Sequence, residues 1–136
     1  MALKKQITFE DNIVTEYHFI SYYGIDRLNG IISLYIRSYA SATTRNEEKE
    51  YQEGLNTQDN IVSQINEEII KETPDNELID SLNEQLTTFG ENPNTCLYTS
   101  FQNIQVGHFI DKEYSLSDLY TLLKETDTFK DSEDLL

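Results

Sequence analysis

The sequence predicts an α+β protein, with an antiparallel sheet of at least four strands, an inserted helical hairpin and a C-terminal helix. Three observations predict this class. The first forty residues alternate apolar with polar side chains and are rich in the β-branched and aromatic residues that strands favour. The acidic middle repeats apolar residues at helical spacing, and a strand-like stretch follows it before a last helical pattern. Because 136 residues is a usual length for one domain, residues 1–136 are expected to form a single domain.

The N-terminal third is expected to form a three-stranded meander over residues 4–9, 13–23 and 31–39. The Asn29-Gly30 dipeptide, a common turn former, precedes the third strand. Alternation divides the side chains of that strand between two faces. The face expected to pack in the core carries Ile32, Leu34, Ile36 and Ser38. The face expected to meet a partner or a second layer carries Ile31, Ser33, Tyr35, Arg37 and Tyr39.

Residues 45–91 are expected to form an acidic helical insertion. A marginal helix over 45–53 is expected to end at Gly54, since glycine often follows the C-terminus of a helix. A helix over 57–72 and a second one that opens at Thr73-Pro74 and reaches residue 88 should then pack as a hairpin. Their apolar stripes consist of Ile61, Val62, Ile65, Ile69 and Ile70, and of Leu78, Ile79, Leu82 and Leu86.

The C-terminal part returns to the sheet and ends in a helix. A strand is expected over 95–105. Ser115 and Asp118 have the spacing of a capping box, which predicts a helix over 116–126. The acidic tail over 130–136 is expected to be loosely held.

The net charge of −15 is unevenly distributed. Residues 1–44 are neutral, residues 45–91 carry −10 and residues 92–136 carry −5. So negative a chain repels phosphate groups, which argues against binding to nucleic acids and to anionic membranes. No apolar stretch approaches the ~20 residues of a membrane-spanning helix, so we expect a soluble protein, made in the cytoplasm, without membrane insertion.

No pattern of residues predicts a catalytic, cofactor-binding or metal-binding site, and we expect no enzymatic activity and no cofactor. His18 in a strand and His108 beside a loop are interpreted as structural or surface histidines, and Cys96 as a small buried hydrophobe. The acidic residues over 127–134 lack the aspartate and glycine positions of an EF-hand loop. A small hydrolase stays open as an alternative; it would need a cleft that brings a histidine close to a carboxylate.

Tyrosines are the residues most indicative of function. Six of them fall in expected strands: Tyr17, Tyr22, Tyr23, Tyr35, Tyr39 and Tyr98. A sheet has two faces, and the chain has too few apolar residues to cover both. An exposed face rich in tyrosine and poor in charge is typical of protein–protein contacts. Some of these tyrosines are expected to fill the core instead, and the acidic helical hairpin is the other region that could carry a contact. The candidate interaction surface consists of Tyr17, Tyr22, Tyr23, Tyr35 and Tyr39.

Several short patterns resemble a known family. The opening Met1-Ala2-Leu3-Lys4-Lys5, followed after a turn by Ile13-Val14-Thr15-Glu16-Tyr17-His18, is similar to the start of small proteins encoded in the tail modules of phages infecting Gram-positive bacteria. The stretches Arg37-Ser38-Tyr39-Ala40-Ser41 and Arg45-Asn46-Glu47-Glu48-Lys49 are similar too, as is the helix and acidic end over 120–134. The resemblance covers residues 1–50 and 95–136, so the helical hairpin would be an insertion.

The resemblance implies a non-enzymatic accessory or structural protein associated with the phage tail or with host adsorption. It also implies a fold related to the N-terminal domains of phage receptor-binding proteins, and it transfers no site residues. The implied partner is a protein, either a tail component or a host protein, and the implied location is the host cytoplasm or the virion tail. The chain is expected to be a monomer or a small homo-oligomer. The alternative function is that of an acidic decoy, which would inhibit a host nucleic-acid-binding enzyme through the charge of residues 45–91.

Overall fold

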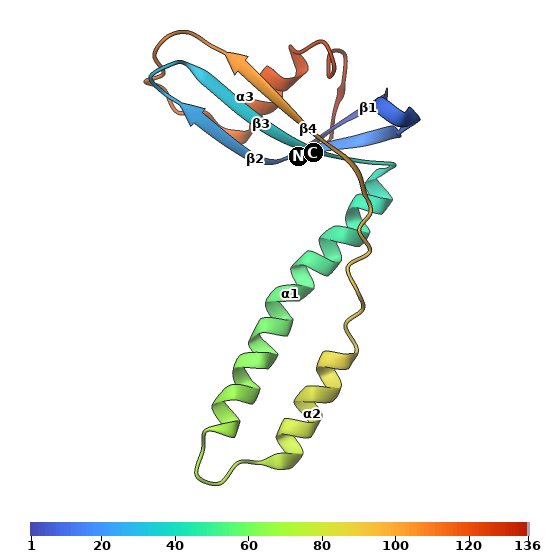
Figure 1. The fold of residues 1–136 in the computed structure, drawn as a ribbon, viewed down its shortest axis with the longest axis vertical. Coiled ribbons are helices and arrows are strands. Elements are labelled where there is room, and N and C mark those ends of the chain that lie inside the picture. Colours follow the sequence, from blue (N-terminus) through green and yellow to red (C-terminus); the bar gives the residue numbers. More distant parts are fainter. Residues whose placement is uncertain (136) are drawn as a thin grey trace. The chain divides into compact units, whose positions relative to one another are not determined.

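The computed structural model describes residues 1–135 and divides the chain into two compact units (Figure 1). The first unit consists of Met1–Arg45 together with the chain from Thr95 onward, and the second consists of Asn46–Asn94. The second unit nearly coincides with the acidic insertion expected over 45–91.

The first unit contains a five-stranded sheet in which every pairing is antiparallel, with the order β4-β3-β2-β1-β5. The predicted fold class is therefore confirmed, and the predicted meander is present as β1, β2 and β3. The strands are β1 (Ala2–Thr8), β2 (Val14–Asp26), β3 (Ile31–Tyr39), β4 (Cys96–Gln105) and β5 (Glu133–Leu135).

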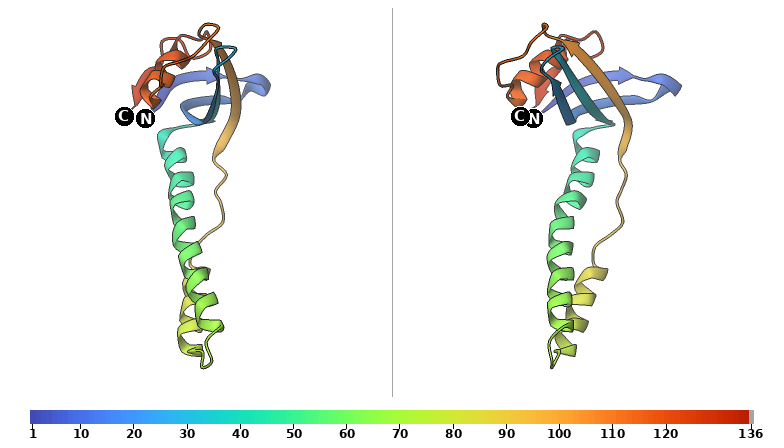
Figure 2. Two further views of the ribbon diagram at one scale, coloured as in Figure 1. Left: turned by 90° about the vertical axis from the view of Figure 1, so that its left-hand side faces the viewer. Right: turned by 60° about the vertical axis from the view of Figure 1, so that its left-hand side comes forward.

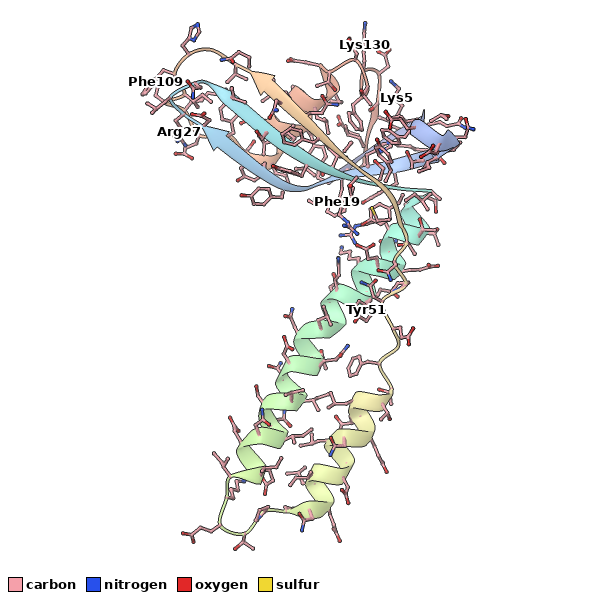
Figure 3. The ribbon with its side chains drawn as sticks, viewed as in Figure 1. Lys5, Phe19, Arg27, Tyr51, Phe109 and Lys130 are labelled. Carbon is pink, nitrogen blue, oxygen red and sulfur yellow. The ribbon has the colours of Figure 1, made fainter. Side chains whose placement is uncertain are left out.

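The C-terminal tail differs from its expected loose state. Residues Glu133–Leu135 form β5 and pair with β1, because the outer edge of β1 offers unpaired backbone groups that the tail can reach. The Lys5 ammonium group donates to the carbonyl oxygens of Thr128 and Lys130 at 3.0 and 2.7 Å (Figure 3). Residue 136 lies outside the described residues. The tail up to residue 135 is thus part of the sheet.

One face of the sheet carries the core of the first unit. Helix α3 (Leu116–Lys124) and the turn after it pack against this face (Figure 2). The expected core side chains of β3 are buried, with at most 1% of their surface exposed. Helix α3 begins with the predicted capping box: Asp118 N donates to Ser115 Oγ, and Ser115 N donates to the Asp118 carboxylate, which lowers the pKa of Asp118. The core cluster includes Leu3, Ile32, Leu34, Ile36, Leu119, Leu123 and Phe129.

The turn between β2 and β3 requires glycine at position 30. Gly30 has φ +68°, in the left-handed region that favours glycine. A Cβ atom at this position would lie 1.3 Å from the carbonyl oxygen of Gly107. The close approach lets Val106 N donate to the Gly30 carbonyl at 2.8 Å, which continues the β3–β4 ladder past the end of both strands.

The second unit is a helical hairpin, as predicted. Helix α1 (Ala42–Ile69) lies in this unit from Asn46 onward and pairs with α2 (Asn76–Thr87). Its small core consists of Ile61, Ile65 and Leu82, flanked by Ile79, Leu86 and Phe89.

The prediction that a first helix ends at Gly54 is wrong, because α1 continues through this residue. Gly54 does not have the positive φ of a helix-ending glycine. A Cβ atom there would lie 3.7 Å from the Phe89 ring, an ordinary contact distance. A glycine inside a helix costs only about 1 kcal/mol relative to alanine, which a helix of 28 residues tolerates.

The start of α2 also differs from the prediction. Asp75, rather than Thr73, is the N-cap, and its carboxylate accepts from Leu78 N at 3.1 Å. The Glu68 carboxylate at the end of α1 orders the connecting loop, since it accepts from Asp75 N at 2.8 Å and from the Lys71 ammonium at 2.6 Å. These hydrogen bonds, that of Lys71 first, lower the pKa of Glu68.

We expect Gly54→Ala to stabilise the hairpin by about 0.5–1 kcal/mol, because alanine loses less backbone entropy in a helix than glycine does. Thermal and urea unfolding followed by circular dichroism at 222 nm will measure the change. Gly30→Ala is the comparison, and it should destabilise the protein because of the Gly107 oxygen. A lower stability of Gly54→Ala would contradict the helical packing of this residue.

Candidate interaction surface

The sheet face opposite α3 carries a row of three aromatic side chains, one from each of β2, β3 and β4. Tyr22 lies opposite Tyr35, and Tyr35 lies opposite Phe101. The ring centroids are 5.3 Å apart for the first pair and 4.9 Å for the second. Tyr22 is 65% exposed, Tyr35 42% and Phe101 48%. We call these three residues the aromatic row.

The aromatic row depends on a bulge in β2. The register of β2 against β3 shifts by one residue between Ile20 and Tyr22. Ile20 pairs with the core residue Ile36, so a regular strand would also direct Tyr22 toward the core. The extra residue, Ser21, moves Tyr22 to the opposite face, next to Tyr35. The Ser21 hydroxyl donates to the Tyr35 carbonyl at 3.3 Å and so joins the bulge to β3.

Tyr120 of α3 supports this region from the core side. The β1–β2 register places Met1 opposite Ile20, but their backbone groups do not pair directly. Instead, the Tyr120 hydroxyl accepts from Ile20 N at 2.8 Å and donates to the Met1 carbonyl at 3.0 Å. Burial raises the pKa of Tyr120 to about 12, so the hydroxyl keeps the proton that it donates. Tyr120 thus satisfies the backbone at the edge of the bulge.

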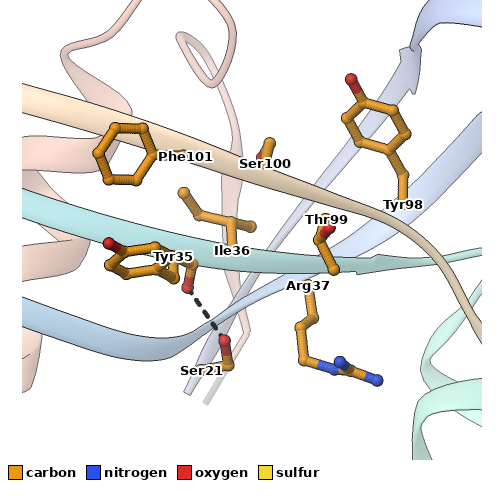
Figure 4. Close-up of a pocket in the computed structure, with 8 residues that line it drawn as sticks. All are labelled: Ser21, Tyr35, Ile36, Arg37, Tyr98, Thr99, Ser100 and Phe101. Atoms are coloured by element: carbon orange, nitrogen blue, oxygen red, sulfur yellow. Dashed lines mark hydrogen bonds between the residues drawn. The ribbon is translucent and has the colours of Figure 1, made fainter.

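A hollow of about 570 Å³ lies beside the aromatic row, over β3 and β4 (Figure 4). Tyr35 and Phe101 line one side of it, and Arg37 and Thr99 line the other. Ser100 Oγ, also in the lining, is buried and has no hydrogen-bond partner within residues 1–135. The remaining lining residues are Ser21, Ile36 and Tyr98.

The other part of this face is covered from within the first unit. Arg45, in the first turn of α1, places its guanidinium 4.1 Å from the Phe19 ring centroid and 5.6 Å from that of Tyr39. Tyr17 contacts Tyr39 edge-on, with centroids 6.1 Å apart. Cation–π and ring contacts therefore hold these side chains together, whereas the aromatic row stays open.

The five predicted surface tyrosines divide into four groups. Tyr22 and Tyr35 belong to the aromatic row. Tyr23 is 44% exposed but lies on the other face, opposite Leu34. Tyr17 is half-buried. Tyr39 is fully buried at 0% exposure, so its expected place on the surface is wrong; the Arg45 contact covers it.

Phe101 is the residue that the tyrosine pattern missed. In β4, the odd-numbered residues are exposed and the even-numbered ones are half-buried. The sequence signal for this face is that Phe101 lies at alternate positions with the polar residues Thr99, Asn103 and Gln105. Its contact with Tyr35 follows from the β3–β4 pairing, which joins segments on either side of the insertion.

No protein-family model, curated protein or solved structure matches this chain. The resemblance to phage tail-module proteins therefore stays a prediction.

The other candidate residues do not come together into a site within residues 1–135. His108 is exposed, and Cys96 is half-buried with its thiol 3.5 Å from the Tyr98 carbonyl. Across residues 1–135, no three His, Cys, Asp or Glu side chains are grouped so that they could hold a metal ion. Over the same residues, the helices are too short or too polar to cross a membrane.

His18 is fully buried, and both of its ring nitrogens form hydrogen bonds with neighbouring strands. Its Nε2 lies 2.8 Å from the carbonyl oxygen of Lys5, which can only accept, so Nε2 carries the proton. Nδ1 then accepts from the Ser38 hydroxyl at 2.8 Å. Lys5 lies in a bulge of β1, and the edge of the His18 ring packs against Phe129, with centroids 5.2 Å apart. Desolvation lowers the pKa of His18 below its ordinary 6.5.

We expect His18 to make stability depend on pH just below neutrality. The unfolded chain binds a proton at the ordinary pKa of 6.5, whereas the folded chain resists protonation until a lower pH. The contribution of His18 is therefore complete above pH 6.5 and decreases as the pH falls toward the lowered pKa. Urea unfolding at pH values between 5 and 7.5 will show a steeper loss of stability for the wild type than for His18→Gln.

The matched control is His108→Gln, which removes an exposed histidine and should keep the wild-type slope. The pKa values of the Asp26, Glu68 and Asp118 carboxyl groups are lowered from ordinary values of 3.8–4.5. These groups therefore change the stability below the pH range of this experiment. Equal slopes for the wild type and His18→Gln would show that His18 is not buried in its neutral form.

Proposed function

We propose that this protein is a non-enzymatic phage accessory or structural protein, associated with the tail or with host adsorption, that acts through protein–protein contacts of the aromatic row. Support for the phage context comes from the short patterns at both ends of the chain. A small protein encoded just downstream of the main tail genes of a Bacillus siphophage has similar patterns. The single observation that carries the contact proposal is the exposure of Tyr22, Tyr35 and Phe101 side by side on a sheet.

The aromatic row has the physical properties of a contact site. Tyrosine and phenylalanine have few rotatable bonds, and here the cross-strand ring contacts restrict them further. Their side chains would therefore lose little conformational entropy when a partner binds. Their tyrosine hydroxyls can donate and accept at the edge of an apolar contact. The hollow beside the row, with the Arg37 and Thr99 side chains at its far side, can receive a protruding side chain of a partner.

The charge distribution favours this surface over the rest of the chain. The part of the sequence that forms β2 and β3 belongs to the neutral first 44 residues, and β4 has no charged residue. A partner of either charge can therefore approach the row at close range without strong repulsion. The acidic residues gather instead in the second unit, where thirteen acidic and two basic side chains lie between residues 46 and 94.

The test is incorporation into particles. In phage that encode the wild-type chain, mass spectrometry of gradient-purified virions should detect the protein in a fixed ratio to tail proteins. The double variant Tyr22→Ser/Tyr35→Ser should reduce its level at least about tenfold, because loss of an aromatic anchor costs about 2 kcal/mol or more in binding. Tyr23→Ser, which removes an exposed tyrosine from the other face, is the matched control and should incorporate normally.

Two results would contradict the proposal. Repeated absence of the wild-type chain from particles would exclude the tail role. Normal incorporation of the folded double variant would exclude the aromatic row as the contact surface. The decoy alternative makes a different prediction: binding to a basic host protein that weakens steeply with salt and is unaffected by the double variant, since the carboxylates of the second unit would carry it.

A further inference from the structure

The two edges of the sheet differ in how they are protected against pairing with another strand. At one edge lies β5, which has three residues and two carboxylates, Glu133 and Asp134. Short length and charge are the usual protections of an edge strand. At the other edge lies β4, which has ten residues and contains no charged residue, proline or glycine. A register shift at Leu97 interrupts the start of β4, but from Tyr98 to Gln105 the edge has none of these protections.

The absence of charge at β4 is unusual within this sequence. Residues 92–110 form a run of nineteen without Asp, Glu, Lys or Arg, whereas the next longest such runs have nine residues. In a chain that is 26% charged and carries −15 overall, the segment at the free edge is the longest without charge. A second copy of this chain would be repelled by the acidic residues over 45–91 and 111–134 but not by this segment.

The register identifies which backbone groups of β4 face outward. The β3–β4 register pairs Ile31 with Gln105, and the hydrogen bond from Val106 N to the Gly30 carbonyl belongs to the next pair in the same register. In an antiparallel ladder, residues that exchange hydrogen bonds alternate with residues that do not. The even-numbered residues of β4 therefore bond to β3. The N–H and C=O groups that point away from β3 belong to Thr99, Phe101, Asn103 and Gln105.

Within residues 1–135, no strand lies beyond β4 to receive these groups, and no backbone hydrogen bond to them is present. Their side chains are all exposed and share the face of the aromatic row. The outer side of β4 is thus a continuous set of donors and acceptors bordered by uncharged side chains.

We propose that the free edge of β4 pairs antiparallel with β4 of a second copy of this chain, about a twofold axis at Phe101. This register places Phe101 opposite Phe101 of the second copy and Thr99 opposite its Asn103. The three pairs from Thr99 to Asn103 would form six backbone hydrogen bonds. The two five-stranded sheets would become one sheet of ten strands.

The aromatic row selects this register among those that the ladder allows. With the axis at Phe101, the row of one copy continues directly into the row of the other, in the order Tyr22, Tyr35, Phe101 and then the reverse. The Phe101 ring, whose centroid lies 4.9 Å from that of Tyr35, would then also meet its counterpart across the axis, in a hydrogen-bonded pair whose Cα atoms are about 5.5 Å apart. The pairing stands independently of the proposed phage role, because it uses only the sheet edge and its side chains.

Sedimentation equilibrium over a concentration series tests the pairing. The wild type should approach twice the 15.8 kDa mass of one chain. Phe101→Lys and Phe101→Glu should each shift to the single-chain mass, because two like charges then meet at the axis. An equimolar mixture of the two variants should regain the double mass. Tyr23→Lys, with the same added charge on the other face, should behave as the wild type.

A second variant removes the backbone donor instead of the ring. In Thr99→Pro, the lost N–H points away from β3, so the fold should persist while the dimer is lost. Amide hydrogen exchange of the wild type, followed by NMR, gives the position of the pairing. The amides of Thr99, Phe101 and Asn103 should gain protection as concentration rises, and those of Ser100 and Gln102 should be protected throughout.

The proposal is overturned by a wild type that keeps the mass of one chain across the series. It is also overturned if Phe101→Lys and Thr99→Pro each still dimerise. A wild-type dimer in which the amides of Thr99, Phe101 and Asn103 exchange freely would overturn it as well. The twofold axis at Phe101 would be contradicted if the wild type dimerises but the equimolar mixture of Phe101→Lys and Phe101→Glu keeps the mass of one chain.

Discussion

The packing of α3 and Phe129 against one face of the sheet is the interaction on which the rest of the first unit depends. Leu119, Leu123 and Phe129 are completely buried against apolar side chains of β1 and β3, which removes one sheet face from water. Among the described residues of the first unit, no comparable apolar layer covers the whole of the opposite face, where the Arg45 contact covers one part. Exposed aromatic side chains are the direct result of this one-sided core.

Two polar side chains make that core compatible with an irregular sheet. The bulge of β1 leaves the Lys5 carbonyl for His18, and the end of the β1–β2 ladder leaves the Ile20 amide and the Met1 carbonyl for Tyr120. A buried backbone group without a hydrogen-bond partner would destabilise the fold by about 1–3 kcal/mol. The His18 and Tyr120 side chains avoid this cost at the two irregularities. The bulge at Ser21 in turn moves Tyr22 to the open face. Tyr120 thus satisfies the backbone next to the bulge that directs Tyr22 outward.

Sequence patterns predicted the features that depend on neighbours in the chain. The alternation in β3 predicted its core face, and Ser115 with Asp118 predicted the start of α3, because each involves residues a few positions apart. The position of Tyr22 could not be predicted in this way, since the register shift that moves it is supported by Tyr120, one hundred residues after Ile20. The burial of Tyr39 depends on Arg45 in the same manner. Strand β5 needed a long-range pairing that its acidic composition did not indicate.

Hydroxyl-radical footprinting of the tyrosines, read out by mass spectrometry, tests the one-sided core most directly. It compares residues of the same type, so differences in the rate of oxidation report exposure. We expect rapid oxidation of Tyr22 and Tyr35 and strong protection of Tyr39 and Tyr120, which are at most 3% exposed. Oxidation of Tyr39 or Tyr120 at the rate of Tyr22, or protection of Tyr22 and Tyr35 equal to that of Tyr120, would contradict it.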